Sequence, residues 1–468
     1  MILEIFIKEI REQLMTTKML VSSTLILVLL IINGYIFNLN YNRRFDKYLE
    51  TKNNNQDNIR KNSTKLLDLI FENQRLIKPP SKLAFISEAE EKVLPNGMEL
   101  NYFTESNPQY YKRQNIFFST FNSIDWAYIL LFFISFVCIS FSYDAFSGEK
   151  VKGTLKLILS NKIARWQIIL GKYFGILTII LIPLLIGFII NLIVLEFNPN
   201  LYLKLNEFLM ILLFLVGTIL FISLNILMGF LISCLTQKPI ISLSFILIFW
   251  IIFNIVIPNI SWLLSKKIVP VDSFSKLNEI ESQRIYDINH SGKYSMSWNS
   301  DWEDDPPNEL VLKRAAGENE KNKAHNEIWR GYRNTIIAQT KTAINLSKIS
   351  PFSIFRFLSE TISDNGFSGV VNFYNQLRNY QINLQNFLNQ KDQADKASYH
   401  LIWDERWATQ FFMSKKGVSF EEIPQFEYHP LSFSQTLDNC KWDILILVLW
   451  NLVLFTGTFV AFARYDVR

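Results

Sequence analysis

Residues that build disulfides and metal sites are scarce in this chain. Its 468 residues include three cysteines and four histidines, with no CxxC pair and no compact Cys/His spacing. A disulfide framework and a structural zinc site are therefore not expected. The four histidines, His290, His325, His400 and His429, are better explained as scattered surface residues than as ligands of a metal site. We also expect no cofactor.

Signatures of catalysis are also missing. The chain contains no Gly-x-Ser-x-Gly and no His-Glu-x-x-His. Residues 148–153 have the glycine spacing of a phosphate-binding loop, but Thr154 and Leu155 follow where that loop needs Lys and then Ser or Thr. We expect that the chain has no ATPase activity of its own and is not an enzyme. A membrane-anchored enzyme or sensor is the least favoured alternative.

Charge is absent from long stretches of the chain. Only 19% of the residues are charged and 49% are hydrophobic, and six apolar runs are long enough to cross a bilayer. No charged residue lies midway along these runs, which disfavours a proton- or ion-coupled transporter. The net charge of +5 is too modest to indicate nucleic acid as a partner. The composition predicts an α-helical polytopic membrane protein embedded in the lipid bilayer.

The apolar runs divide the chain into six expected transmembrane helices. These are residues 19–37, 126–143, 173–195, 208–235, 240–264 and 442–463. Residues 1–18 alternate apolar and charged positions at helical spacing, which predicts an amphipathic helix on the membrane surface. The polar remainder comprises 38–125, 144–172, 265–441 and the tail 464–468.

The distribution of Lys and Arg predicts the orientation. Six spans place both termini on one side, and the only short segment on the other side carries Lys204 alone. The short segments on the side of the termini carry Lys8, Arg11, Lys18, Lys150, Lys152, Lys156, Lys162, Arg165, Lys172, Lys238, Arg464 and Arg468. By the positive-inside rule, the termini and residues 144–172 are cytoplasmic, and the two large polar regions are extracytoplasmic. The composition suggests a low-GC bacterium, hence its plasma (inner) membrane.

The two large polar regions are expected to be mainly helical. The first begins with a stretch that predicts an irregular helix after residue 38. In the second, apolar residues at helical spacing predict helices over 309–350, ended by Pro351, and over 367–397. Residues 418–433 contain two prolines and are expected to be extended.

The interval 144–172 predicts a helical hairpin. Residues 149–159 form an amphipathic pattern with Val151, Leu155, Ile158 and Leu159 on one side and the lysines on another. Ser160-Asn161 predicts a turn and helix cap, and a second helix follows over 162–170. Gly171 and Gly175 have the small-xxx-small spacing that permits close helix packing. The hairpin is a natural docking site for a soluble protein, and an ordinary solvated loop is the alternative.

The same interval resembles the coupling segment of ABC transporter permeases of the type-2 exporter superfamily. The resemblance lies in Asp144, Glu149, Gly153-Thr154-Leu155, Ser160-Asn161 and Gly171-Lys172. The surface helix before the first span and the end of the chain are also similar. Ile349-Ser350-Pro351 resembles permeases with an enlarged outer domain, including those linked to gliding motility and copper-enzyme maturation.

This resemblance implies a half-transporter that pairs with a second permease chain, identical or homologous, and with separate ATP-binding subunits. It implies export driven by ATP hydrolysis in those subunits. The residues expected to dock the ATP-binding subunit are Asp144, Glu149, Lys150, Gly153, Thr154, Ser160, Asn161 and Arg165. The alternative is a mechanotransmitting or scaffold subunit that drives a periplasmic partner without moving a substrate.

Overall fold

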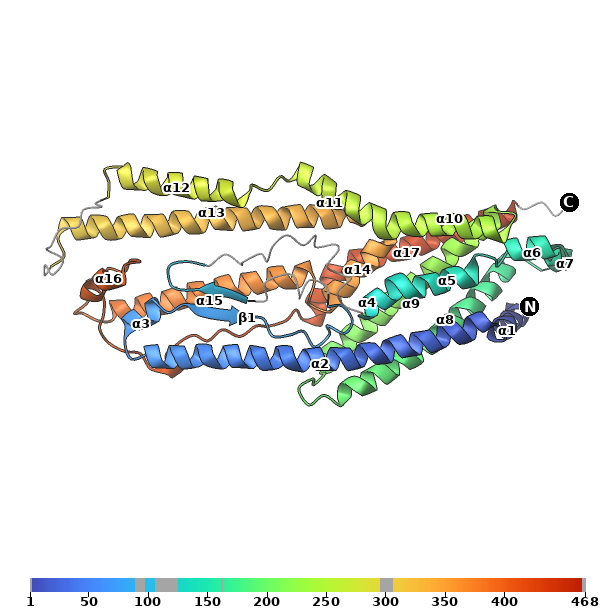
Figure 1. Cartoon of the computed structure of the whole chain (residues 1–468), viewed down its shortest axis with the longest axis horizontal. Helices are drawn as coiled ribbons and strands as arrows, with labels where there is room; N and C mark the ends of the chain where they lie inside the picture. Colours follow the sequence, from blue (N-terminus) through green and yellow to red (C-terminus); the bar gives the residue numbers. More distant parts are fainter. Residues whose placement is uncertain (1, 89–96, 106–124, 161–162, 295–305, 465–468) are drawn as a thin grey trace.

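The computed structural model describes residues 2–88, 97–105, 125–160, 163–294 and 306–464. The described residues form an elongated, almost wholly helical molecule with both termini at one end (Figure 1). We call this the terminal end and the opposite one the distal end. The one sheet in the described residues pairs two antiparallel strands, β1 (Gln74–Ile77) and β2 (Gly97–Leu100).

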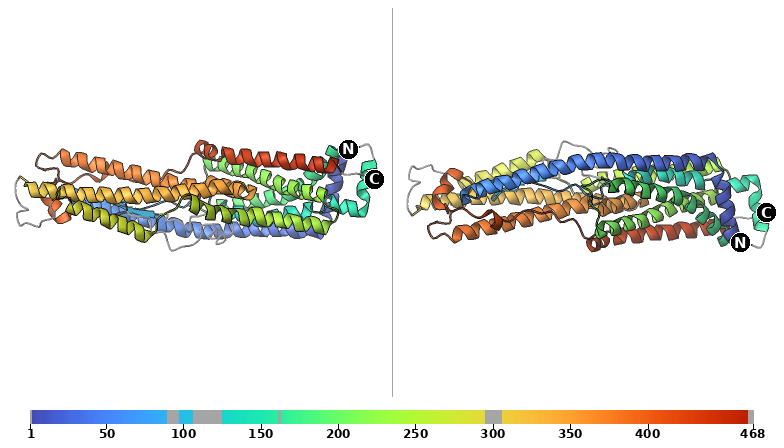
Figure 2. Two further views of the ribbon diagram at one scale, coloured as in Figure 1. Left: turned by 90° about the horizontal axis from the view of Figure 1, so that it is seen from above. Right: turned by 90° about the horizontal axis from the view of Figure 1, so that it is seen from below.

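Six helices are long and apolar enough to cross a membrane, which confirms the expected α-helical polytopic fold. The second and fifth spans are each built from more than one helical segment, because a π-helical stretch interrupts the regular α-helical hydrogen bonding. The spans are α2 (Thr17–Asn62), α4–η2–α5 with α6 (Trp126–Lys152), α8 (Arg165–Glu196), α9 (Leu205–Leu235), α10–η3–α11 (Pro239–Ile268) and α17 (Phe433–Ala463). A short helix, α1 (Ile2–Leu14), precedes them at the terminal end (Figure 2).

Helix α2 continues far beyond the expected first span. An irregular helix was expected after residue 38, but α2 runs unbroken to Asn62. Residues 38–62 contain neither proline nor glycine, so nothing in the sequence stops the helix at the membrane surface. At 1.5 Å per residue, its 46 residues span about 69 Å, more than twice a hydrocarbon core of roughly 30 Å. The part beyond the bilayer supports the distal region.

The distal region consists mainly of helices with two small cores. Its longer helices are α12 (Phe274–His290), α13 (Glu309–Ser347) and α15 (Phe367–Gln393), and its short ones are α3 (Leu66–Ile70) and α16 (Arg406–Phe412). One core joins α3, the strands and α15, and the other joins α13, Trp403 and α16. Residues 418–433, expected to be extended, contain a single 3-10 turn, Phe420–Glu422, and no strand.

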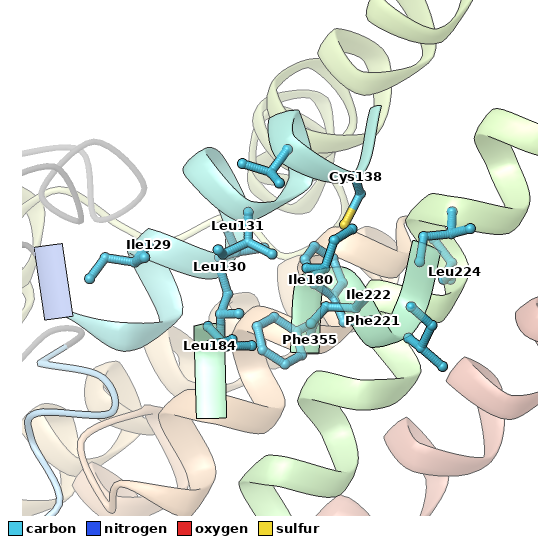
Figure 3. Close-up of a cluster of buried hydrophobic side chains, with 14 of the residues drawn as sticks. Ile129, Leu130, Leu131, Cys138, Ile180, Leu184, Phe221, Ile222, Leu224 and Phe355 are labelled. Carbon is cyan, nitrogen blue, oxygen red and sulfur yellow. The ribbon is translucent and has the colours of Figure 1, made fainter. Parts of the chain in front are cut away.

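Helix α14 (Pro351–Ile362) belongs to the core of the spans, although it was expected in a polar outer region. Its Phe355 lies against Phe221 of α9 (Figure 3). The two rings stack with their centroids 4.4 Å apart. Ser350 caps α14 by accepting the Ser353 backbone N–H at 3.3 Å, and Pro351 takes the first helical position. The Ser350 hydroxyl also donates to the Phe253 carbonyl in the fifth span. The Ile-Ser-Pro sequence therefore starts a helix that packs into the core of the transmembrane bundle.

The second and fifth spans each contain a π-helical segment. These are η2 (Ile129–Ile134), between α4 (Trp126–Tyr128) and α5 (Ser135–Ser142), and η3 (Ile252–Val256), between α10 (Pro239–Ile251) and α11 (Ile257–Ile268). The Trp250 indole N–H donates to the Ser135 hydroxyl at 2.9 Å, and that hydroxyl donates to the Leu131 carbonyl at 2.7 Å. The two spans are thus linked next to their irregular segments.

Candidate functional site

The hairpin after the second span is built from two short helices and not from one. Helix α6 (Ser147–Lys152) ends at Gly153, whose φ of 72° lies in the left-handed region that favours glycine, and α7 (Thr154–Ser160) follows. The single amphipathic helix expected over 149–159 is therefore wrong. Because Gly153 turns the chain, Val151 is 64% exposed, whereas Leu155 is buried and Ile158 and Leu159 pack against the same core. Three of the four residues expected on the apolar face therefore share it, and Val151 does not.

The base of the hairpin is fixed to the end of α9. The Ser233 hydroxyl accepts the backbone N–H groups of Phe146 and Ser147 at 3.1 and 3.0 Å. The Lys150 ammonium donates to the carbonyls of Cys234 and Thr236 at 2.5 and 2.9 Å. These carbonyls lie at the C-terminus of α9, where a cation is favoured by the helix dipole. Lys150 thus serves as an anchor to the fourth span.

A nearly buried charge cluster joins the hairpin to two other helices. The Lys172 ammonium of α8 lies 2.8 Å from the Glu149 carboxylate of α6 and 3.2 Å from the Glu9 carboxylate of α1. The side chains of Lys172, Glu149 and Glu9 are only 6%, 15% and 7% exposed. Removing one partner from such a cluster leaves a desolvated charge uncompensated. We call these three residues the charge junction.

Gly171 and Gly175 lie where α1 crosses α8. A Cβ atom on Gly171 would lie 2.7 Å from the Ile5 Cγ2 atom, and one on Gly175 would lie 2.8 Å from the Glu9 Cβ atom. The two glycines therefore allow the close approach that brings Glu9 to Lys172. The expected packing contact is formed with α1, the helix that precedes the first span.

Replacing Gly175 by valine is expected to lower the free energy of unfolding by about 1–3 kcal/mol, because the added side chain collides with Glu9. Gly331→Val is the matched control, since no atom lies within 4 Å of a Cβ built on that helical glycine. Denaturant unfolding of the two purified variants in detergent measures the difference. Equal stabilities would contradict the close α1–α8 contact.

The remaining expected docking residues are spread over the hairpin and its margins. Asp144 lies 4.0 Å from the Lys18 ammonium at the start of α2. The Thr154 hydroxyl is 3.5 Å from the Glu149 carbonyl, and that of Ser160 donates to the Leu157 carbonyl at 2.7 Å. Asn161 falls outside the described residues.

Arg165 links the hairpin to the last span. Its guanidinium donates to the Phe462 carbonyl at 2.7 Å and also to the Ala463 carbonyl, at the C-terminus of α17. Together with Lys150 and the charge junction, this contact joins the hairpin to α1, α8, α9 and α17. A displacement of the hairpin would therefore act on several spans at once.

The outward surface of the hairpin combines apolar and basic side chains. Leu157 is 69% exposed, and Val151, Lys152 and Lys156 are also exposed. Leu157 was not among the expected docking residues. Its exposure follows from its position two residues after the buried Leu155, because residues two apart on a helix point in different directions. An exposed apolar surface of this kind, rimmed by charge, is typical of a protein-binding site.

The family comparison bears on the whole chain. The model of the ABC-2 family transporter protein matches residues 3–467, which covers nearly every element described above. The chain belongs to the ABC-2 transporter family. A comparison with curated proteins found no match. Membership identifies an ABC-2 permease, a membrane subunit of a family whose members associate with an ATP-binding subunit.

Proposed function

We propose that this ABC-2 permease couples ATP hydrolysis by a separate ATP-binding subunit to export across the bacterial plasma membrane. The observation that carries the proposal is the exposed apolar and basic surface of α6–α7, on the end of the molecule that holds both termini. The excess of Lys and Arg in the short segments at that end supports a cytoplasmic location. The phosphoryl transfer from ATP to water would take place in the ATP-binding subunit.

The contacts at the base of the hairpin suggest how the motion reaches the spans. The ATP-binding subunit would press on Val151 and Leu157, and the hairpin would move α9 through Lys150 and Ser233. Through Glu149 and Lys172 the same displacement would reach α1 and α8. ATP binding shifts the permease between two conformations only if the partner contacts them with different affinity.

A complete exporter requires two permease chains, identical or homologous, and two ATP-binding subunits. In the proposed assembly the surface helix α1 lies on the cytoplasmic face and the distal region lies outside the cell. Helices α2 and α13 are long enough to extend far from the bilayer. The distal region is where a substrate-delivering or periplasmic partner would bind.

Labelling with a membrane-impermeant maleimide tests the orientation. Cys138, Cys234 and Cys440 are buried, so the native chain should give a low background. The cells are treated so that the reagent reaches the outer face of the plasma membrane while that membrane stays sealed. Leu310→Cys on α13 is then expected to react without lysis, whereas Leu157→Cys should react only after lysis. The reverse pattern would overturn the proposed topology. Stimulation of ATP turnover when permease and ATP-binding subunit are reconstituted together tests the coupling itself.

A further inference from the structure

A cavity of about 170 Å³ lies between the second span, the fifth span and α14. Both π-helical segments line it, through Leu131 and Phe132 of η2 and through Asn254 and Ile255 of η3. π-Helical segments interrupt the regular hydrogen bonding of a helix and often occur at functional sites. The cavity lies where the spans meet the distal region, away from the α6–α7 hairpin.

One wall of this cavity is apolar and another is charged. Phe132, Ile255 and Phe352 contribute to the apolar wall, whereas Asp125, Arg356 and Glu360 contribute the charges. Ile255 is also 40% exposed on the outside of the fifth span, so the apolar wall continues onto the surface of the bundle. A molecule with a charged end and an apolar body matches this division.

The charges around the cavity leave one carboxylate without a cation. The Arg356 guanidinium donates to Glu360 at 2.6 Å, and the Arg44 guanidinium donates to Glu88 at 2.8 Å. Asp125 accepts the backbone N–H groups of Tyr128 and Glu88 at 2.7 and 2.9 Å, but it forms no ion pair with any Lys or Arg of the described residues. Its charge is therefore stabilised by dipoles alone.

Burial raises the pKa of Asp125 to about 7, and the nearby carboxylates of Glu88 and Glu360 contribute in the same direction. The two N–H groups that it accepts act in the opposite direction but do not offset the burial. In addition, the Ser353 hydroxyl is buried and has no hydrogen-bond partner among the described residues, although this residue lines the cavity. Unpartnered buried polar groups are uncommon and call for a ligand or another partner.

We infer that this cavity binds the ammonium end of an amphiphile, with the charged group beside Asp125 and the alkyl chain along Phe132 and Ile255. An ammonium offers three donors, which suit a carboxylate and the Ser353 hydroxyl. Tyr128, close to Asp125 in the chain, also lines the cavity, and an aromatic ring attracts a cation. That the bound amphiphile is also the exported molecule rests on the proposed function; the binding itself does not.

Binding of radiolabelled hexylamine to the purified full-length permease, without the ATP-binding subunit, tests the inference. Saturable binding is expected, and Asp125→Asn should weaken it at least tenfold while preserving the helix cap, because asparagine caps as well as aspartate. Leu131→Trp fills the cavity and should abolish binding. Asp272→Asn is the control, because this exposed residue pairs with Lys276 far from the cavity.

Two comparisons can overturn the inference. Hexanol has the same alkyl chain without the charge. If hexanol bound as tightly as hexylamine, Asp125 would not be recognising the ammonium group. Hexylamine binding should also strengthen about tenfold from pH 6 to pH 8, because Asp125 ionises around pH 7 while the amine stays protonated. Binding that is independent of pH, or unchanged in Asp125→Asn, would contradict the site. Because no ATPase is present, that result would leave the coupling proposal untouched.

Discussion

Replacing Lys172 by methionine is expected to lower the free energy of unfolding by about 3–5 kcal/mol, the largest stability effect of any single substitution proposed for this chain. The substitution leaves the carboxylates of Glu9 and Glu149 nearly buried and next to each other without their common cation. Methionine retains most of the aliphatic length of lysine, so the loss reports on charge more than on packing. Denaturant unfolding in detergent measures it.

The matched control is Lys276→Met. Lys276 also pairs with a carboxylate, that of Asp272 at 2.6 Å, but both side chains are about half exposed, and an exposed pair contributes only about 0–1 kcal/mol. If the two methionine variants lost the same stability, the charge junction would be no more than a surface ion pair. Adding Glu9→Gln and Glu149→Gln to Lys172→Met should recover part of the loss, since no uncompensated charge then remains.

Replacing Leu157 by aspartate is expected to abolish stimulated ATP turnover and weaken co-purification of the ATP-binding subunit at least tenfold. Leu157 is the most exposed apolar residue of the hairpin, and an aspartate in an apolar contact must be desolvated when the partner binds. The stability of the permease alone should not change, because the side chain is 69% exposed.

Leu310→Asp supplies the comparison for Leu157→Asp. Leu310 is exposed on α13, outside the hairpin, so its replacement should leave ATP turnover unchanged. If both variants were equally active, the hairpin surface would not be the docking site. If Leu157→Asp lost activity only because the permease unfolded, its unfolding curve would reveal this before any binding measurement.

Substitution of Glu149 by lysine cannot by itself identify a docking contact. The new ammonium would face Lys172 at the place where the native carboxylate lies 2.8 Å away. The two cations repel each other in a poorly solvated site, so the base of the hairpin is displaced even without a partner. Loss of ATP turnover in Glu149→Lys therefore tests the charge junction, whereas Leu157→Asp tests the surface.

The sequence predicted the membrane part of this fold well, because apolar runs of bilayer length have few alternatives to spanning helices. It was less informative about where helices end. The first span continues to Asn62 because the polar stretch that follows it contains no proline or glycine to end the helix. Helix α14 carries polar residues beside its buried phenylalanines, so its amphipathic pattern fits a water-exposed domain as well as the core of the spans.

The candidate site was predicted in position but not in detail. Glu149, Thr154 and Ser160 do lie in the short helices α6 and α7 at the terminal end. Gly153 divides these two helices, and periodicity alone does not reveal its left-handed turn. The charge junction depends on Glu9, which is 163 residues away from Lys172 in the chain. Single-sequence patterns contain no information about such a distant pairing. Exposed Leu157 became recognisable only when its neighbour Leu155 was found buried.

Photo-crosslinking from position 157 tests the central claim most directly. A benzophenone amino acid would replace Leu157 in the full-length permease, produced in cells together with its ATP-binding subunit, and the same substitution at Leu310 serves as the control. We predict a crosslinked product that contains the ATP-binding subunit from position 157 and none from position 310. Absence of that product at position 157, while the two subunits still co-purify, would contradict docking at the α6–α7 hairpin.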